Sequence, residues 1–253
     1  MTVPSLAPPP GARLVIAGGS GGIGRAVVDA CVALQHRVTV LDQLRAIEAN
    51  PPPAGVAAIP LNAMDEASVA SAFEAVRAAD SGLDGLVNLV GFTNDRRPVE
   101  ELSLGEWHEI LGGSLTSAFL LARAAAPLLR VRGGSLVNTS STFGAEVKLS
   151  GFGPYAVAKA GIINLTRVLS LELGPTIRVN AIAPGLTDTA FLVGGTGRPE
   201  KSVRTNLEKV AAMTHLKRIG RPEDMVGPIL FLLGPASAYI TAQTLHVNGG
   251  AWS

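Results

Sequence analysis

Tyr155 and Lys159 have a spacing that suits proton chemistry. On a helix, residues four positions apart lie on one face, so this phenol and this ammonium would be neighbours. A nearby positive charge favours phenolate and lowers the pKa of a tyrosine from about 10. Such a pair could move a proton to or from the oxygen of an alcohol or a carbonyl while a hydride is transferred. Most pairs with this spacing are ordinary surface neighbours, so the rest of the chain must supply a hydride donor.

Composition narrows the classes of protein to which the chain can belong. With 253 residues, 47% hydrophobic and 16% charged, it can bury a sizeable core. A net charge of +1 gives no electrostatic case for binding nucleic acid or an acidic membrane surface. The single cysteine, Cys31, excludes an intrachain disulfide framework and fits a reducing compartment, so we expect a cytoplasmic protein. No apolar run reaches the ~18 residues that span a bilayer, and four scattered histidines make a metal site unexpected.

A glycine-rich turn near the N-terminus predicts a dinucleotide site. A short β-branched run, Arg13–Ala17, leads into Gly18–Gly24, followed by a helical pattern, a strand at Arg37–Leu41 and then Asp42. Glycines leave the N–H groups of a helix N-terminus open to a phosphate. Asp42 could accept both hydroxyls of a ribose and would repel a 2′-phosphate, which predicts NAD rather than NADP. The alternative is a plain glycine turn with Asp42 as a helix cap, but the order of the elements favours the dinucleotide.

Strand and helix patterns alternate along the rest of the chain. The expected strands are Gly55–Leu61, Leu83–Val90, Gly133–Ser140, Ile177–Ala183 and Gln243–Val247, and the expected helices begin after Asp65 or cover Glu101–Leu129, Gly153–Leu173 and Pro222–Leu233. The alternation predicts an α/β fold: a single-domain, Rossmann-like, doubly wound sheet of about seven parallel strands with helices on both faces. We expect residues 12–253 to form this domain after a flexible arm, residues 1–11. Ligands of such sheets bind at the carboxyl ends of the strands.

The motifs together resemble those of the short-chain dehydrogenase/reductase family, from about Arg13 to Gly250. They are Gly18-x-x-x-Gly22-x-Gly24, Asp42, Asn88-Leu-Val-Gly91, Asn138-Thr-Ser-Ser141, Tyr155-x-x-x-Lys159, Pro184-Gly185-x-Thr187-x-Thr189, Arg218-x-x-Gly-Arg-Pro222 and Val247-Asn-Gly-Gly250. The resemblance implies that Tyr155 is the general acid or base, that Lys159 lowers its pKa and binds the nicotinamide ribose, and that Ser141 hydrogen-bonds the substrate oxygen. NAD would carry the hydride. The implied cofactor-binding residues are Gly18, Ser20, Gly22, Ile23, Gly24, Asp42, Asn62, Asn88, Gly91, Tyr155, Lys159, Pro184, Gly185, Thr187 and Thr189.

The segment Asn88–Gly91 matches the family motif imperfectly, and the sequence departs from the family pattern at four further places. Ala17 replaces a common threonine, and Asn62 replaces an aspartate near the adenine, where an amide can still hydrogen-bond. The spacing from Ser141 to Tyr155 is one residue longer than usual. A neighbouring hydroxyl, of residue 140 or 142, could therefore point inward instead, although we favour Ser141. Ser114 stands where the family has an asparagine that helps to hold a water beside the lysine. It could keep that role through its carbonyl or hydroxyl, or it could be only a small helix residue.

Two functions are compatible with these residues. The first is an NAD-dependent alcohol dehydrogenase or ketoreductase, interconverting a secondary alcohol and a ketone on a small, mostly apolar substrate enclosed by a lid at about residues 186–217. The second is a catalytically silent dinucleotide-binding or regulatory protein, suggested by Ser114 and the altered segment Asn88–Gly91. The resemblance also implies a homotetramer, with Glu101–Leu129 and Gly153–Leu173 pairing between copies.

Overall fold

A parallel sheet of seven strands forms the centre of the molecule. The computed structural model describes residues 3–93, 96–198 and 205–251. In these residues the sheet has the order β3-β2-β1-β4-β5-β6-β7. The strands are β1 Arg13–Ala17, β2 Arg37–Asp42, β3 Ala57–Pro60, β4 Gly85–Asn88, β5 Ser135–Thr139, β6 Arg178–Pro184 and β7 Thr244–Val247. The α-helices are α1 Gly22–Ala33, α2 Leu44–Ala49, α3 Glu66–Ala79, α4 Leu104–Leu111, α5 Ser117–Arg132, α6 Thr142–Ala145, α7 Gly153–Leu173, α8 Leu207–Met213 and α9 Val226–Leu233.

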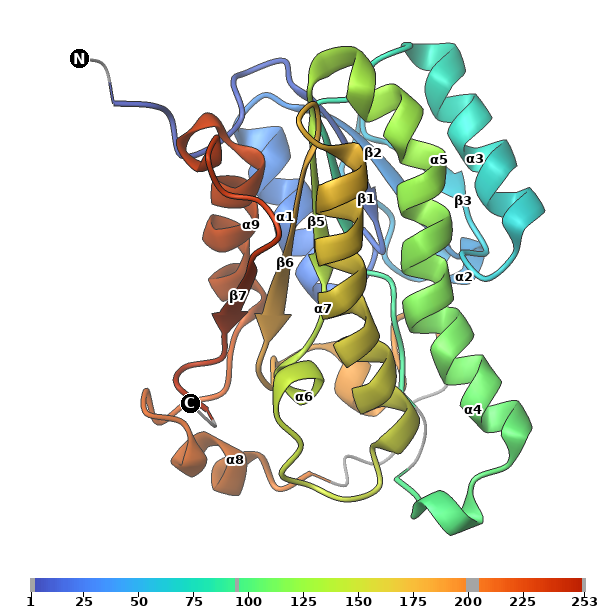
Figure 1. Ribbon diagram of the computed structural model, residues 1–253, viewed down its shortest axis with the longest axis vertical. Helices are drawn as coiled ribbons and strands as arrows, with labels where there is room; N and C mark the ends of the chain where they lie inside the picture. Colours follow the sequence, from blue (N-terminus) through green and yellow to red (C-terminus); the bar gives the residue numbers. More distant parts are fainter. Residues whose placement is uncertain (1–2, 94–95, 199–204, 252–253) are drawn as a thin grey trace.

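Helices cover both faces of the sheet (Figure 1). Along β1, successive side chains point to opposite faces, so Val15 packs in the core with α3, α5 and α7, and Ile16 packs in the core with α1 and α9. At the centre of the sheet both faces are covered, so β1 and β4 are buried along their whole length without alternation, as expected of a parallel sheet. The predicted α/β fold class, a single-domain Rossmann-like sheet, is confirmed.

The π-helical turn and helix α2 are among the elements that differ from the expectation. The pattern over Glu101–Leu129 predicts one mostly helical run, but a π-helical turn, Gly112–Thr116, separates α4 from α5. Its glycines allow a close approach: a Cβ on Gly112 would lie 2.9 Å from the Met64 Cε, and one on Gly113 would collide with the Phe92 ring. Helix α2, directly after β2, was not predicted, because its six residues are too few to show a period.

The expected lid and arm are partly described. Residues 199–204 of the expected lid, and residues 1–2 of the arm, lie outside the described residues. The described lid holds a 3₁₀ turn, Ala190–Val193, and helix α8. In the arm, Ser5 accepts a hydrogen bond from the backbone of Ala236 at 3.1 Å, just after α9.

The helical stretch from α4 through α5, Leu104–Arg132, is long and apolar enough to cross a membrane, with a mean hydropathy of 1.2 in its most apolar window. In that window 56% of the stretch is buried inside the fold. Leu121 and Leu129 of α5, for example, belong to the core shared with α3 and the sheet. Packing in the core therefore accounts for its apolar composition.

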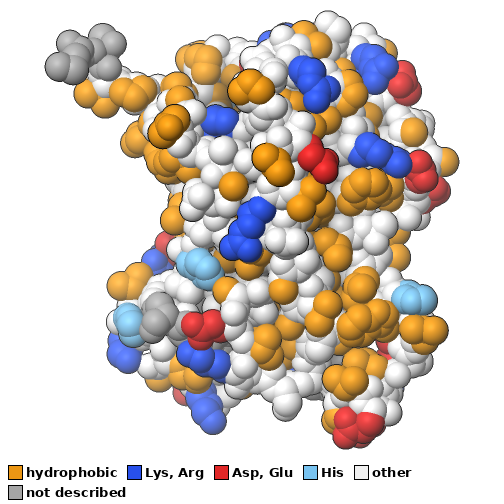
Figure 2. All heavy atoms as spheres, in the orientation of Figure 1, with side chains coloured by type: hydrophobic (Ala, Val, Ile, Leu, Met, Phe, Trp, Pro, Cys, Tyr) orange, Lys and Arg blue, Asp and Glu red, His pale blue; other side chains and the backbone are white. Residues whose placement is uncertain are grey.

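Hydrophobic side chains also recur on the outer surface of α5 and α7. Figure 2 shows this face, where charged side chains are scattered among the hydrophobic ones. Phe119 of α5 is 43% exposed, and Val157, Val168 and Leu171 of α7 are 48%, 41% and 85% exposed. Helices α5 and α7 lie side by side in Figure 1, so these residues share one face of the molecule.

Candidate active site

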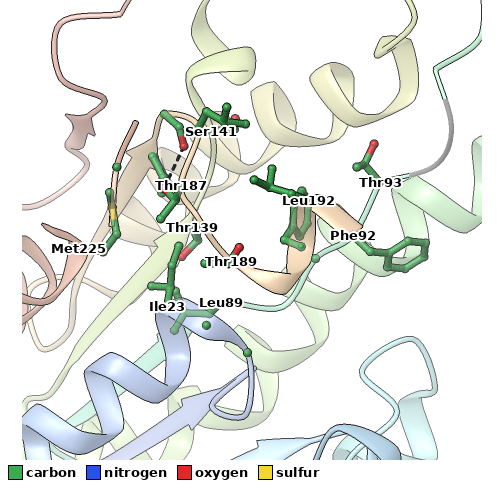
Figure 3. Close-up of a pocket in the computed structure, with 18 of the residues that line it drawn as sticks. Ile23, Leu89, Phe92, Thr93, Thr139, Ser141, Thr187, Thr189, Leu192 and Met225 are labelled. Carbon is green, nitrogen blue, oxygen red and sulfur yellow. Dashed lines mark hydrogen bonds between the residues drawn. The ribbon is translucent and has the colours of Figure 1, made fainter. Parts of the chain in front are cut away.

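A cavity of about 560 Å³ opens at the carboxyl ends of the strands. The glycine turn after β1, the ends of β4 to β6, the start of α7 and the segment after β6 line it. In the view of Figure 3, Leu192 of the lid lies between Ser141 and Thr93, with Ile23 and Leu89 on the far side of the cavity. This is the position in which doubly wound sheets bind their ligands.

The glycine turn forms a tight cradle at the start of α1. Gly18 has φ +82°, and a Cβ there would lie 2.9 Å from the carbonyl carbon of Leu89. A Cβ on Gly24 would collide with the Gly18 carbonyl, so only glycine fits at either position. The Ser20 hydroxyl is buried and has no hydrogen-bond partner among the described residues. A bare helix N-terminus with an unsatisfied hydroxyl fits the phosphates of a dinucleotide.

Asp42 is held beside this cradle at the end of β2. Its Oδ2 accepts from the Ser20 backbone N–H at 3.0 Å, and its Oδ1 accepts from the Gln43 backbone N–H at 2.8 Å. Burial raises the pKa of the carboxyl, while these two hydrogen bonds and the nearby Arg45 lower it. Asp42 lines the cavity, and each oxygen still has a lone pair for a further hydroxyl donor.

The Ser141 hydroxyl reaches Tyr155 at the other end of the cavity. The two hydroxyls are hydrogen-bonded, and the Ser141 Oγ also accepts from the backbone N–H of Phe143 at 3.2 Å, as the N-cap of α6. The neighbouring hydroxyls of Ser140 and Thr142 donate instead to backbone carbonyls of α7 and β6, at 2.8 and 3.1 Å. Of the three adjacent hydroxyls, the structure brings that of Ser141 to Tyr155.

Lys159 lies one turn further along α7. Its Nζ donates to the Thr139 carbonyl at 2.9 Å and lies 5.6 Å from the centroid of the Tyr155 ring. Burial lowers the pKa of Lys159 to about 8. Burial also raises the pKa of Tyr155, and the hydrogen bond from Ser141 lowers it. In this arrangement burial is the largest influence on the pKa of Tyr155, and the expected lowering of that pKa by Lys159 stays a prediction.

Ser114 lies behind this cluster in the π-helical turn. It is fully buried, its hydroxyl has no partner among the described residues, and its carbonyl accepts from the Ser117 hydroxyl at 3.1 Å. A Cβ on Gly91 would lie 3.1 Å from the Lys159 Nζ and 3.6 Å from the Ser114 Oγ, which places these two polar atoms at most about 6.7 Å apart. One bridging water could span such a gap.

Aromatic rings form the wall around Tyr155. The Phe152 and Phe191 ring centroids lie 6.5 and 6.2 Å from that of Tyr155. Phe143 packs on Phe152 with 4.6 Å between centroids. The wall beside the hydroxyls of Ser141 and Tyr155 is therefore aromatic, which suits a substrate that places one reacting oxygen there.

Most of the residues predicted for the site lie together. Those that line the cavity are Gly18, Gly22, Ile23, Gly24, Asp42, Gly91, Ser141, Tyr155, Lys159, Pro184, Gly185, Thr187 and Thr189. Four others do not line it. Ser20 and Ser114 lie directly behind it, as described above. The Asn88 side chain hydrogen-bonds Asn138 and the Val90 backbone beneath the floor. Asn62 is exposed and caps the Met64 N–H.

Phe92, Arg96 and Phe143 are among the lining residues that sequence reasoning missed. Phe92 and Arg96 follow Gly91, and Phe143 follows Ser141, so all three come shortly after strand ends at the rim. Their place shortly after a strand end is the feature of the sequence that could have identified them as lining residues. No motif marks them, because loops after strands vary in length and direction.

Known proteins resemble the chain along nearly its whole length. A family model described as enoyl-(acyl carrier protein) reductase matches residues 17–251. The 3-oxoacyl-(acyl-carrier-protein) reductase FabG of Aquifex aeolicus is 31% identical over 245 residues, which cover 93% of this chain and 95% of that protein. The cis-4-hydroxycyclohexanecarboxylate dehydrogenase of Sinomonas cyclohexanicum is 34% identical over 188 residues, 74% of this chain and 72% of that protein. A solved short-chain dehydrogenase/reductase from Serratia marcescens superimposes with a TM-score of 0.86 at 28% identity, covering 97% of this chain and 100% of that one.

Proposed function

The chain belongs to the short-chain dehydrogenase/reductase family of nicotinamide-dinucleotide oxidoreductases, and we propose that it interconverts a secondary alcohol and a ketone on a small substrate, using NAD. The hydrogen bond between Ser141 and Tyr155, beside the aromatic wall of the cofactor cavity, carries this proposal. The activities for which the two relatives are named support it: one is a reductase of an oxo group, and the other is a dehydrogenase of a hydroxyl-bearing ring.

Asp42 supports NAD rather than NADP. Its carboxylate lines the cavity at the end of β2, where it would accept hydrogen bonds from the ribose hydroxyls of the adenosine half. A 2′-phosphate would bring two negative charges against this carboxylate, which is unfavourable at such short range. The cradle of Gly18, Gly22 and Gly24, with the buried Ser20 hydroxyl, would hold the phosphates.

Tyr155 would transfer the proton. In the direction of reduction, its hydroxyl gives a proton to the carbonyl oxygen as that oxygen becomes an alkoxide, and in oxidation the phenolate takes the proton back. The Ser141 hydroxyl would stabilise the negative charge on the oxygen by donating a hydrogen bond. Thr187 and Thr189, at the end of the cavity beside Gly185, would hold the carboxamide of the nicotinamide. The bound dinucleotide supplies or accepts the hydride.

Lys159 and Ser114 would connect Tyr155 to solvent. With a pKa of about 8, the Lys159 ammonium can exchange a proton near neutral pH. The Ser114 hydroxyl, buried within about 6.7 Å of the Lys159 Nζ, would hold a water in place of the family's asparagine. Lys159 would also bind the ribose of the nicotinamide half.

A catalytically silent, dinucleotide-binding protein is the second candidate. Two departures from the family pattern favour it: Ser114 in place of asparagine, and the segment Asn88–Gly91. Such a protein would bind NAD and turn over no alcohol or ketone.

We further propose a cytoplasmic homotetramer. The buried, free Cys31 supports the cytoplasmic location, and the hydrophobic outer face of α5 and α7 supports the assembly.

Turnover by matched tyrosine variants tests the proposal. The wild-type enzyme is assayed with NAD and with NADP against a panel of secondary alcohols and ketones, by nicotinamide absorbance. We expect activity with NAD, and a loss of about 10²- to 10⁴-fold in Tyr155→Phe with NAD binding unchanged. Tyr239→Phe makes the same change at a fully exposed tyrosine and should keep full activity. Tight NAD binding without turnover of any panel member would favour the silent protein instead, and an active Tyr155→Phe enzyme would exclude the proposed proton transfer.

A further inference from the structure

Arg96 places a guanidinium at the substrate end of the cavity. It is half-buried, follows β4 in the loop that carries Gly91, and lines the same cavity as Tyr155. Its guanidinium carbon lies 4.6 Å above the centroid of the Phe152 ring, whose own centroid is 6.5 Å from that of Tyr155. These two distances place the guanidinium within about 11 Å of the Tyr155 ring. A small substrate that reaches the Tyr155 hydroxyl could also reach this cation.

The guanidinium is oriented but keeps free hydrogen-bond donors. Stacking on Phe152 fixes its plane, and Nη2 donates to the Thr205 hydroxyl at 2.6 Å. A guanidinium has five N–H donors, so several remain for a planar anion. Among the described residues no carboxylate pairs with Arg96, whereas the adjacent Arg97 pairs with Glu106 at 3.6 Å.

The described lining of the cavity has no acid at this end. Its two carboxylates are Asp42, at the adenosine end, and Asp224, which pairs with Arg218 at 2.6 Å. The pocket around Phe152 therefore presents a cation on an aromatic ring without a counter-ion among those lining residues. A carboxylate on the substrate would provide the missing partner, since a guanidinium binds a carboxylate through paired hydrogen bonds.

We propose that the substrate carries a carboxylate, and that Arg96, stacked on Phe152, binds it and so determines substrate specificity. The inference rests on the proposed function, because it assigns a substrate class to the same site. It replaces the expectation of a mostly apolar substrate with that of a hydroxy- or oxo-carboxylate: an apolar chain or ring that carries the reacting oxygen at one end and the anion at the other.

Matched acids and esters test this specificity. The probes are methyl ketones with a terminal carboxylate two to five carbons from the carbonyl, each paired with its neutral methyl ester. For at least one length, we expect wild-type kcat/KM to be about tenfold or more higher for the acid than for the ester. In Arg96→Met the preference should disappear through a higher KM for the acid, while activity on the ester is kept. Equal use of acids and esters by the wild type, or a preference that survives in Arg96→Met, would overturn the proposal.

Two control variants separate binding of the substrate from other roles of Arg96. Thr205→Val removes the hydrogen bond to the lid segment but keeps the cation, so it should retain the preference for the acid. If Thr205→Val abolishes the preference as Arg96→Met does, Arg96 acts only as a latch for the lid, and the proposal fails. Arg97→Gln removes a neighbouring, exposed positive charge and should also retain the preference; its loss there would indicate a general field effect instead.

If the enzyme turns over none of the probes, the proposed function fails, but the inference that Arg96 binds a carboxylate can still be tested by a binding measurement. The same acids and esters are titrated calorimetrically into the enzyme with saturating NAD. Binding of an acid that Arg96→Met weakens about tenfold or more supports the carboxylate site. Acids that do not bind, or that bind both proteins equally, overturn it.

Discussion

Lys159 carries a buried charge, which costs stability, and it has a proposed role in proton transfer, for which that charge is needed. Its pKa falls from the usual 10.5 to about 8 because burial disfavours the ammonium. Between pH 8 and 10.5 the unfolded chain binds a proton that the folded chain does not, so this residue makes stability rise with pH in that window. Below pH 8 the full cost of the buried charge is present, at about 3 kcal/mol for a fall of this size.

Lys159→Met should therefore stabilise the protein at neutral pH while abolishing turnover. We expect the free energy of unfolding at pH 7 to rise by about 1–2 kcal/mol, since the lost hydrogen bond to the Thr139 carbonyl offsets part of the gain. The difference from wild type should shrink as the pH approaches 10. Urea unfolding at pH 7 and pH 10, at one protein concentration, measures both values. Lys148→Met, at an exposed ion pair with Glu146, should change the stability by less than about 1 kcal/mol. A Lys159→Met variant that is less stable than wild type, or whose difference from wild type is the same at both pH values, would contradict the lowered pKa of Lys159.

For single residues of the site, the sequence predicts contacts between residues on the same helix. It does not predict contacts between residues that lie far apart in the chain. Tyr155 and Lys159 share a helix, so their spacing alone predicts that they meet. The sequence favours Ser141 but leaves the adjacent hydroxyls as alternatives, because their hydrogen bonds run to α7 and β6, which come later in the chain. Arg96 depends on Phe152, which lies 56 positions later, and no local pattern encodes that contact.

The segment after β6 is held at two places along the cofactor side of the cavity. A Cβ on Gly22 would lie 2.6 Å from Thr189, and a Cβ on Gly197 would lie 2.5 Å from the carbonyl oxygen of Arg45 in α2. The described lid therefore packs against both the glycine turn and the helix that follows Asp42. Packed in this way, it covers the groove proposed for the dinucleotide.

Gly197→Val should weaken NAD binding by displacing this segment from α2. Gly197 has φ +71°, and a side chain there would collide with the α2 backbone, so we expect the Kd for NAD to rise about tenfold. Gly195→Val is the matched control: with φ +107° it has comparable backbone strain, but the nearest atom to its Cβ, apart from its chain neighbours, is the Arg198 Cδ at 3.7 Å. It should weaken binding less. Equal effects of the two variants on calorimetric NAD titrations would show that strain, rather than packing on α2, is responsible.

Helices and strands were predicted well where their hydrophobic residues recur regularly or form one apolar run. The pattern of α7 gave its observed bounds, Gly153–Leu173, and the apolar runs located all seven strands to within a few residues. The π-helical turn at Gly112–Thr116 could not be predicted, because one extra residue in a turn barely alters a period of 3.6. Its cause is tertiary: Phe92 and Met64 pack closely on its glycines.

At the scale of the whole molecule, the alternation of strands and helices constrains the topology strongly. Parallel strands joined by helices leave few arrangements, and burial of both faces requires apolar strands, which the chain has. The assembly of the chain into an oligomer is harder to predict from the sequence than its topology. A hydrophobic residue on an outer helix face looks the same in sequence as one in the core, so only the structure shows that Leu171 of α7 is 85% exposed.

The exposed face of α5 and α7 is where we expect copies of the chain to pair. Phe119, Val157, Val168 and Leu171 are exposed on these helices, and in a twofold interface this patch of one copy would face the same patch of the other. Leu171→Glu would place like charges together in that interface and remove its most exposed apolar side chain. We expect wild-type protein to sediment at about four times the chain mass of 26.0 kDa, and Leu171→Glu to sediment as smaller species at the same concentration.

Leu34→Glu is the control. It adds the same charge beyond the end of α1, outside this face, and should leave the mass of the assembly unchanged. A wild-type protein of 26.0 kDa in solution, or a Leu171→Glu variant that assembles like wild type, would exclude this interface.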